Sequence, residues 1–230
     1  MGADDVAAYY DRYWTDAGFQ PPPNGNAFLE EQIARFGRPG VSIADLGCGD
    51  ARTVGDRLES SGASYVGVDV SPSAVEAATS RGLDVRLIED IASSGLEAGS
   101  FDAVFIIEVV EHLMDPLSAV HEARQLLRPG GSLLVTCPNA AVWIRRAELL
   151  FLGRPNAMGD ELSRSEPWRD PHIRSFTPST LEAMIRLAGF DHVTVGGTEP
   201  SFPVKAWGSA LARRRTSLFA RRCTAIAVAP

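Results

Sequence analysis

The strongest constraint on the fold is a regular alternation of short apolar runs and longer amphipathic segments. Apolar runs of strand length occupy residues 41–46, 65–70, 85–88, 101–107 and 132–136, and two more follow at 193–195 and 220–228. Helices are expected between them, because Ser71-Pro72, Asp115-Pro116 and Thr177-Pro178 each place a capping side chain before a proline at the first helical position. The alternation predicts an α/β fold, a doubly wound and mostly parallel sheet of seven strands.

The expected helices have definite limits. One covers residues 50–60, and the next runs from Pro72 to near Gly82. A third runs from Pro116 to Leu127, where Pro129-Gly130-Gly131 is expected to end it, and a fourth covers residues 178–189.

Length and composition fit one globular domain. The chain has 230 residues, of which 45% are hydrophobic and 22% are charged. Its formal net charge of −7 disfavours nucleic acid and anionic membranes as partners. No apolar run approaches the roughly 18 residues of a membrane span. Three cysteines are too few for a disulfide framework, which favours a reducing compartment and a cytoplasmic location.

A single domain, residues 1–230, is expected to have four parts. They are an N-terminal cap (1–36) with the aromatic run of residues 9–14, a ligand-binding core (37–137), an insertion on the substrate side (138–176), and a C-terminal helix with the last strands (177–230). Connections as long as the insertion often form lids or binding loops.

Polar residues and glycines follow the first three predicted strands, where open α/β sheets bind ligands. Gly47 and Gly49 allow a tight turn and a close backbone approach. Arg52 stands where a dinucleotide fingerprint would have its third glycine, which weakens a pyrophosphate-binding interpretation. Asp69 could accept both hydroxyls of a ribose, and Asp90 with the Ile91 amide could bind an adenine.

The series Asp-Leu-Gly-Cys-Gly, Val-Gly-Val-Asp, Phe-Asp-Ala-Val and Leu-Arg-Pro-Gly-Gly resembles the class I S-adenosylmethionine (SAM)-dependent methyltransferases over residues 41–137. The resemblance implies a Rossmann-like methyltransferase fold. It also implies that the Gly47–Gly49 loop faces the methionine of SAM and that Cys48 packs rather than reacts. The implied SAM-binding residues are Asp45, Gly47, Cys48, Gly49, Asp69, Val70, Asp90, Ile91 and Glu108.

Glu108, Glu111 and His112 follow the fourth predicted strand, on the side where a substrate pocket opens. If residues 108–112 form a helical turn, the three side chains share one face. With the later His172, this pattern resembles Mg²⁺-dependent small-RNA 2′-O-methyltransferases and ubiquinone-biosynthesis O-methyltransferases. The resemblance implies that Glu108, Glu111, His112 and His172 hold Mg²⁺ or another divalent cation.

The expected catalytic residues are His112, His172 and Glu111. Without a metal, either histidine could be the general base, because histidine titrates near neutral pH. Similar E-H pairs occur in methyltransferases of this fold that use no metal, and there Glu108 contacts the cofactor.

Residues 137–190, with the Pro138-Asn139 start and the later His-Ile-Arg-x-Phe-Thr, resemble methyltransferases of bacterial polysaccharide and natural-product pathways and the methyltransferase-like proteins of methionine biosynthesis. Trp143, Trp168 and Trp207 could stack on a sugar ring, and Arg174 could meet a substrate anion. We therefore expect a SAM-dependent O-methyltransferase whose partner is a small-molecule hydroxyl acceptor, first of all a saccharide, with homodimer formation left open. Three alternatives stay open: a catechol or quinone-precursor O-methyltransferase, an RNA 3′-end 2′-O-methyltransferase using the basic residues 213–222, and a non-catalytic SAM-binding partner of a methionine-biosynthesis enzyme.

Overall fold

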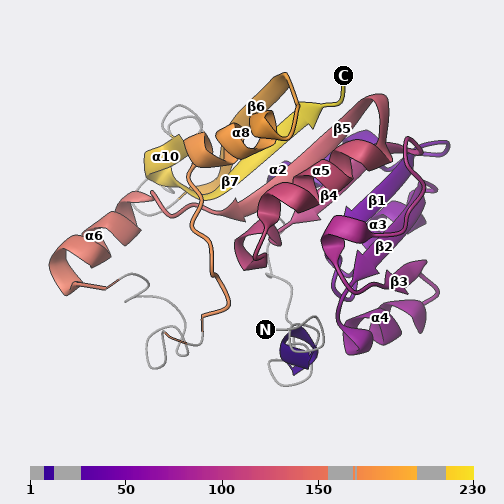
Figure 1. The fold of residues 1–230 in the computed structure, drawn as a ribbon, viewed down its shortest axis with the longest axis horizontal. Coiled ribbons are helices and arrows are strands. Elements are labelled where there is room, and N and C mark those ends of the chain that lie inside the picture. The colour runs from indigo at the N-terminus through magenta and orange to yellow at the C-terminus, as the bar shows by residue number, and fades with distance from the viewer. Residues whose placement is uncertain (1–7, 13–26, 155–167, 169, 201–215) are drawn as a thin grey trace.

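The computed structural model describes residues 8–12, 27–154, 168, 170–200 and 216–230. A seven-stranded sheet crosses the molecule in the order β3-β2-β1-β4-β5-β7-β6 (Figure 1). The strands are β1 (Ser42–Leu46), β2 (Ser64–Asp69), β3 (Val85–Leu87), β4 (Phe101–Ile107), β5 (Leu127–Pro138), β6 (His192–Pro200) and β7 (Ala220–Val228). This confirms the predicted doubly wound α/β fold.

The strand directions decide which residues meet at each edge of the sheet. β1 to β5 pair in parallel, so their carboxyl ends lie along one edge. β7 enters between β5 and β6 and is antiparallel to both. Because it runs the opposite way, the first residues of β7 lie beside the last residues of β5, with Arg222 opposite Pro138.

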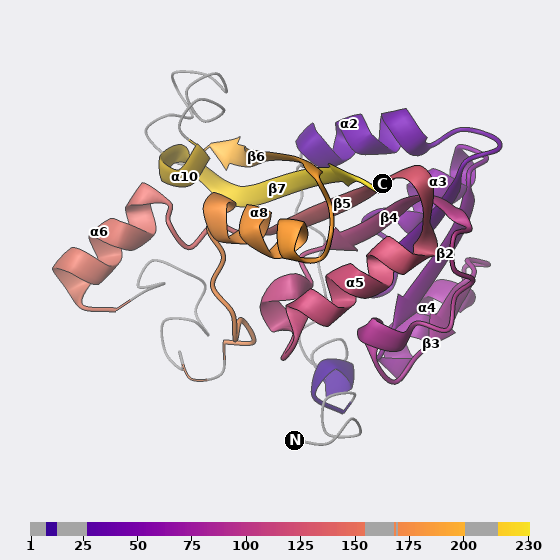
Figure 2. The same ribbon diagram turned by 45° about the horizontal axis from the view of Figure 1, so that its top comes forward.

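Helices cover both faces of the sheet, as Figure 2 shows with α2 on one side and α5 and α8 on the other. They are α2 (Ala27–Phe36), α3 (Gly55–Ser60), α4 (Pro72–Thr79), α5 (Pro116–Leu126), α6 (Trp143–Leu152), α8 (Pro178–Leu187) and α10 (Thr216–Phe219), with two 3₁₀ helices, η1 (Ile91–Ser93) and η2 (Val110–His112). One core cluster packs under α5 and α8 and the other under α2, α3 and α4. None of the helices in these described ranges has the length and hydropathy to cross a bilayer.

The three predicted helix caps are confirmed. Ser71, Asp115 and Thr177 each accept a hydrogen bond from a backbone N–H in the first turn of α4, α5 and α8, and each precedes a proline. Caps of this kind satisfy donors that the helix itself leaves unpaired.

Several boundaries differ from the prediction, among them the end of β6, which lies at Pro200 rather than at residue 195, and the starts of α3 and β5. α3 begins at Gly55 rather than at residue 50, because Gly49 and Ala51 have positive φ angles and the chain is still turning there. Pro129-Gly130-Gly131 does not separate α5 from the fifth strand; β5 already begins at Leu127, and its register with β4 shifts at this point. The proline and the two glycines form a local irregularity within β5.

Candidate active site

The loop after β1 is a tight turn closed by backbone hydrogen bonds. The amides of Gly47 and Cys48 both donate to the Val68 carbonyl, at 2.8 and 3.1 Å. Gly47 has a φ of +75°, and a Cβ there would lie 2.7 Å from Cγ2 of Val109. No other residue fits this position without moving the chain after β4, so the loop and that chain are packed as one unit.

Asp69 ends β2, and its carboxylate is held on both oxygens. Oδ2 accepts the Gly49 amide at 2.7 Å and Oδ1 accepts the Ser71 amide at 2.9 Å. The side chain is buried, and burial raises its pKa, although the hydrogen bonds from Ser71 and Gly49 act in the opposite direction. Asp69 therefore ties the loop after β1 to the start of α4, besides presenting lone pairs to a ligand.

Asp45 is buried inside β1, below the loop. Tyr65 donates its hydroxyl to Oδ2 of Asp45 at 3.0 Å. Burial is the main reason that the pKa of Asp45 rises to about 7, with a smaller contribution from Asp69. Cys48 packs against Gly67, where a Cβ would lie 2.6 Å from its sulfur, and burial raises its thiol pKa well above the usual value. A thiol held neutral in this way is a packing group, not a nucleophile.

The residues after β2 and β3 complete this side. Val70 is half-buried directly after β2. Asp90 caps η1, its Oδ1 accepting the Ala92 amide at 2.9 Å, and Ile91 is buried beside the position of Gly47. The structure thus brings all the expected residues that follow β1, β2 and β3 to one edge of the sheet.

A helical turn at residues 8–12 reaches across this edge; it is the indigo element in Figure 1. Asp11 accepts the Ser73 amide at 2.8 Å and the Ser71 hydroxyl at 3.2 Å. Tyr10 donates its hydroxyl to the His112 carbonyl at 3.3 Å. The turn therefore contacts both the start of α4 and η2. Tyr13 and Trp14, also expected in this cap, lie outside the described residues.

Glu108 follows β4 in a left-handed conformation, with φ +57°. Its Oε1 accepts the Thr136 hydroxyl at 2.7 Å, and its Oε2 accepts a hydrogen bond from Nη1 of Arg222. The helical turn expected over residues 108–112 is wrong, because η2 contains only Val110–His112 and Glu108 lies outside it. Glu108 and Glu111 consequently do not project from one helix face.

Glu111 stands out by its burial and by the hydrogen bonds that its carboxylate lacks. It is 2% exposed, and neither of its carboxylate oxygens has a hydrogen-bond partner within the described residues. Burial, followed by the neighbouring charge of Glu108, raises its pKa well above the usual value. A buried carboxylate without partners is costly. No described residue satisfies this carboxylate, which makes Glu111 a candidate ligand for an added group.

Two histidines lie next to Glu111. Nε2 of His112 is 3.9 Å from Glu111 Oε1, and the rings of His112 and His172 have centroids 4.8 Å apart. Nδ1 of His112 lies 3.2 Å from the Pro171 carbonyl, and Nδ1 of His172 lies 2.7 Å from Asp170 Oδ1. Since a carbonyl oxygen can only accept, Nδ1 of His112 carries the proton, which leaves Nε2 with a lone pair.

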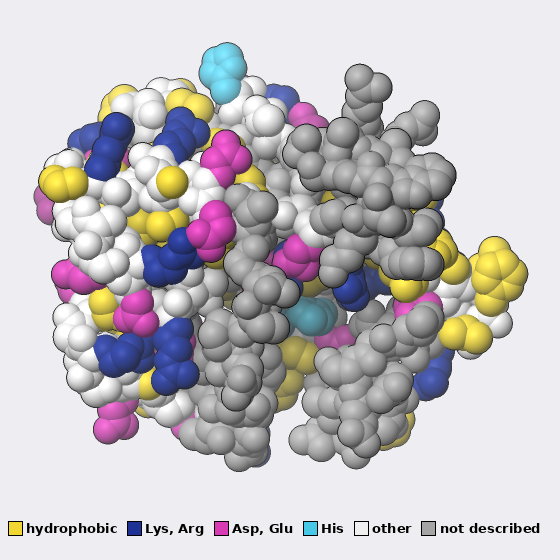
Figure 3. Space-filling model, turned by 180° about the vertical axis from the view of Figure 1, so that it is seen from behind, with side chains coloured by type: hydrophobic (Ala, Val, Ile, Leu, Met, Phe, Trp, Pro, Cys, Tyr) yellow, Lys and Arg dark blue, Asp and Glu magenta, His cyan; other side chains and the backbone are white. Residues whose placement is uncertain are grey.

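Burial, with a smaller effect of His172, lowers the pKa of His112 to about 4. His112 is therefore neutral at neutral pH and can bind a cation or accept a proton. Figure 3 shows histidine side chains near the centre of one face, beside acidic and basic ones. A hydrogen-bonded second ring nitrogen is also the usual arrangement of a histidine that binds a metal.

The distant His172 reaches this place through the segment after the insertion. Phe176 forms a bridge with Asn139, and its carbonyl accepts the Ala140 amide at 2.8 Å. The Arg174 amide donates to the Glu111 carbonyl at 3.0 Å. These contacts fix residues 170–176 against η2. Of the four expected metal ligands, Glu111, His112 and His172 have ligand atoms within 4.8 Å of one another, whereas Glu108 is engaged by Thr136 and Arg222.

Sequence reasoning missed the partners of these residues. Thr136 and Arg222 bind Glu108, and Glu199 in turn accepts Nε of Arg222 at 2.7 Å. Arg222 belongs to the basic residues 213–222 that the RNA alternative would use, but it is half-buried and paired. Arg213, Arg214 and Arg215 lie outside the described residues. Only the antiparallel register of β7 brings Arg222 here, and no local signal reports it.

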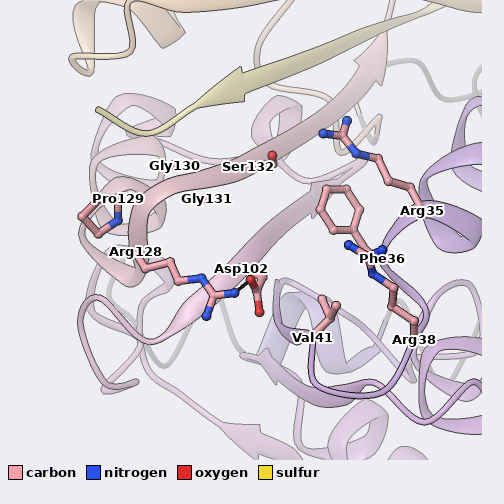
Figure 4. A pocket seen from close by; sticks show the side chains of 10 residues that line it. All are labelled: Arg35, Phe36, Arg38, Val41, Asp102, Arg128, Pro129, Gly130, Gly131 and Ser132. Atoms are coloured by element: carbon pink, nitrogen blue, oxygen red, sulfur yellow. Dashed lines mark ion pairs between the residues drawn. The ribbon is translucent and has the colours of Figure 1, made fainter.

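A hollow of about 290 Å³ lies at the opposite edge of the sheet (Figure 4). Arg35, Arg38 and Arg128 line it, and Arg128 pairs with Asp102. Because ligands of open α/β sheets bind at the carboxyl ends of the strands, this hollow is not the candidate active site.

Known proteins similar to this chain are methyltransferases. Residues 44–135 match the family described as "Methyltransferase domain". The chain is 30% identical over 205 residues to the ubiquinone biosynthesis O-methyltransferase of Xanthomonas campestris pv. campestris strain B100, covering 84% of this chain and 82% of that protein. A homologue of the same name from Xanthomonas oryzae pv. oryzae strain PXO99A is 32% identical over 205 residues, with the same coverage.

The fold is similar to that of a solved methyltransferase from Thermotoga maritima, described as a possible histamine N-methyltransferase. The TM-score is 0.66 at 19% identity, and the match covers 98% of this chain and 100% of that one. At this identity the similarity concerns the fold alone.

Proposed function

Because the chain belongs to the class I SAM-dependent methyltransferases, we propose that it is an O-methyltransferase that acts on one hydroxyl of a catechol-like small molecule. The observation that carries this proposal is the buried carboxylate of Glu111, which has no hydrogen-bond partner in the part of the chain that the structure describes, beside two imidazoles. That set suits an acceptor with two neighbouring oxygens better than an isolated hydroxyl. The printed name of the Xanthomonas relatives, an O-methyltransferase of ubiquinone biosynthesis, supports the same acceptor class.

A saccharide was the first expectation from the sequence, and nothing in the comparisons supports it. The relatives favour the catechol or quinone-precursor alternative. The RNA alternative also loses support, because Arg222 is engaged by two carboxylates and is not available for phosphates. We place the reaction in the reducing cytoplasm, which suits the three free cysteine thiols.

In this proposal the cofactor lies along the edge formed by the ends of β1, β2 and β3. Asp69 would hold the ribose hydroxyls, and Asp90 with the Ile91 amide would hold the adenine. Asp45 and the loop of Gly47, Cys48 and Gly49 would face the methionine part, with Val70 and Glu108 beside it. The tight turn with positive φ at Gly47 and Gly49 supports this assignment, since glycines there let the loop backbone approach a ligand closely.

We further propose that Glu111, His112 and His172 hold a divalent cation. The residues fit, because the two Glu111 oxygens lack donors and Nε2 of His112 has a lone pair. Carboxylate oxygens suit Mg²⁺, and a pair of imidazoles also suits Mn²⁺ or Zn²⁺. When bound, the cation would orient two neighbouring oxygens and lower the pKa of the reacting hydroxyl.

The protein's own groups have separate tasks. Asp170 and the Pro171 carbonyl orient the two rings, and the low pKa of His112 keeps its Nε2 unprotonated, as a cation ligand has to be. Tyr10 covers His112 from the side of the N-terminal turn, at 5.9 Å between ring centroids, and this excludes water from that approach.

The test is a calorimetric titration of Mg²⁺ into EDTA-treated protein saturated with S-adenosylhomocysteine, for wild type and for Glu111→Ala. We expect saturable binding in the wild type and none in the variant. In parallel, formation of S-adenosylhomocysteine from SAM is measured with catechols and glycosides, and catechols should be methylated. Turnover of glycosides alone would overturn the acceptor class, and absence of cation binding would overturn the metal site.

A further inference from the structure

Arg222 lies between two glutamates that come from different strands. It sits near the start of β7, opposite Thr198 of β6 and Pro138 of β5. Nη1 binds Glu108, which follows β4, and Nε binds Glu199 of β6 at 2.7 Å. The side chain of Arg222 is only 26% exposed. One guanidinium thus joins the chain after β4 to β6.

The backbone at both glutamates is strained. Glu108 has a φ of +57° and Glu199 a φ of +56°, and in the described part of the chain Ala51 is the one other non-glycine residue in this region. Such conformations persist where surrounding contacts hold them, and they gather at functional sites. Here the two strained residues share a partner, because each directs its carboxylate to Arg222.

This arrangement decides what Glu108 can bind. Glu108 directly follows β4 and lies three residues before Glu111, at the same edge of the sheet. Yet Oε2 of Glu108 is engaged by Arg222, and Glu108 is not among the three residues whose ligand atoms converge. Glu108 is therefore a neighbour of the cation site with one oxygen held away from it.

The charges of the cluster add a second argument. Glu108, Glu111 and Glu199 bring three carboxylates, and Arg222 is the guanidinium placed among them. If all are ionised, two negative charges remain, which one divalent cation would neutralise. Because Arg222 also bonds to Glu199, it has a second carboxylate to stay with when Glu108 turns toward a cation.

We propose that Arg222 is a positioning residue that competes with the cation for Glu108, and that Glu199 retains Arg222 when Glu108 is released. Arg222 thereby sets the affinity of the site and keeps Glu108 ordered when no cation is bound. This inference rests on the cation site of the proposed function. It adds a mechanism by which β6 and β7 tune that site.

The test measures the Mg²⁺ dissociation constant by calorimetry in S-adenosylhomocysteine-saturated protein. Arg222→Gln should tighten Mg²⁺ binding about three- to tenfold, because it frees Glu108. Glu199→Gln should weaken binding about threefold, since Arg222 then has Glu108 alone. Arg221→Gln, the exposed neighbour on the same strand, serves as the control for loss of a positive charge and should change binding by less than twofold.

A double-mutant cycle separates competition from general electrostatics. In a Glu108→Gln background, Arg222→Gln should no longer tighten binding. An equal effect in both backgrounds, or weaker binding in Arg222→Gln, would overturn the proposal and leave the cation site standing. No Mg²⁺ binding in the wild type would overturn both. If Arg222→Gln does not fold, Arg222→Lys keeps the charge but cannot span both carboxylates, and it should tighten binding as well, whereas unchanged affinity would contradict competition.

Discussion

Two buried carboxylates at the edge formed by the carboxyl ends of β1 to β5 differ in their hydrogen bonds. On the cofactor side, the residues that follow β1 to β3, Asp69 is 7% exposed and accepts backbone amides on both oxygens. The acceptor side consists of the residues that follow β4, segment 170–176, the end of β6 and the start of β7. There Glu111 is 2% exposed, and its oxygens accept nothing from the described residues.

The difference shows what each side needs in order to be complete. The cofactor side is finished by the protein itself, since its carboxylates already hold the loops in place. The acceptor side carries a buried carboxyl group whose oxygens have no partner among the described residues, and a bound cation would satisfy them. In the proposed function, one side would hold the cofactor rigidly and the other would be completed when a cation binds. Both would serve catalysis, because positioning two reactants provides much of the rate acceleration.

Replacing Glu111 should have the largest effect. Glu111→Gln removes the charge with little change of volume, and we expect activity to fall by at least about a thousandfold, which is about 4 kcal/mol. Affinity for S-adenosylhomocysteine should stay within twofold. Mg²⁺ should raise the melting temperature of the wild type and leave that of the variant unchanged. A large loss of cofactor affinity would remove the contrast between the two sides.

Asp45 tests whether a buried carboxyl group on the cofactor side also lowers the stability of the fold at neutral pH. Its pKa is about 7 in the folded protein and 3.8 is the ordinary value. The folded state holds the proton more tightly, so the free energy of unfolding should decrease as pH rises from about 4 to 7. Asp45→Asn should remove this decrease, a difference on the order of 3 kcal/mol between the ends of the window. Urea unfolding of both proteins at several pH values measures it, and parallel curves would contradict the assignment.

Asp69 should matter for both affinity and stability. Asp69→Ala deprives the Gly49 and Ser71 amides of their acceptor, and we expect cofactor affinity to fall about tenfold and stability by about 1–3 kcal/mol. Asp69→Asn keeps one acceptor oxygen and should lose less of both. Cofactor titration and urea unfolding give the two values, and unchanged affinity in Asp69→Ala would contradict the ribose assignment.

Gly47→Ala tests the packing between the loop after β1 and the chain after β4. We expect a loss of about 1–2 kcal/mol of stability, because the new methyl group meets Val109 in addition to the strain of a positive φ. Gly99→Ala is the matched control, with φ +66° and open space around it. It should show the strain alone. Equal losses in the two variants would mean that the contact with Val109 relaxes freely.

The smallest effects should come from the N-terminal turn, which contacts both sides. Tyr10→Phe removes the bond to the His112 carbonyl and should raise the acceptor KM about two- to fivefold. Asp11→Ala removes the contacts to Ser71 and Ser73 and should weaken the cofactor instead, by a similar factor. Steady-state kinetics with each substrate varied in turn would measure both KM values for each variant. If both variants changed the same KM, the assignment of Tyr10 to the acceptor and Asp11 to the cofactor would be wrong.

The fold could be predicted where the signal is local. The strand limits Phe101–Ile107 and Ala220–Val228 agree with the apolar runs, and the caps at Ser71, Asp115 and Thr177 agree with the side chains before their prolines. The start of β5 could not be predicted in this way. Pro129, Gly130 and Gly131 usually end structure, and here pairing with β4 and with the residues after β7 overrides that tendency.

In the candidate site, too, residues with a local sequence signal could be predicted and those that depend on distant contacts could not. Asp45, Asp69 and Asp90 could be found because each lies in or directly after its own strand. Glu108 could be located but not its bonds, because its partners Thr136 and Arg222 depend on the registers of β5 and β7. The gathering of His172 with Glu111 was expected from resemblance, yet its physical cause lies in contacts of residues 170–176 that no spacing rule contains.

The place of β7 in the sheet has a consequence for the order of assembly. β7 follows all the other strands along the chain, yet it lies between β5 and β6 and pairs with both. β6 is synthesised earlier, but it pairs with β7 and therefore cannot join the sheet before β7 does. The final docking joins segments far apart in sequence and should be slow. Arg222 arrives with that strand. A nascent chain can therefore form the edge at the ends of β1 to β3 early, whereas Arg222 reaches Glu108 only when β7 docks.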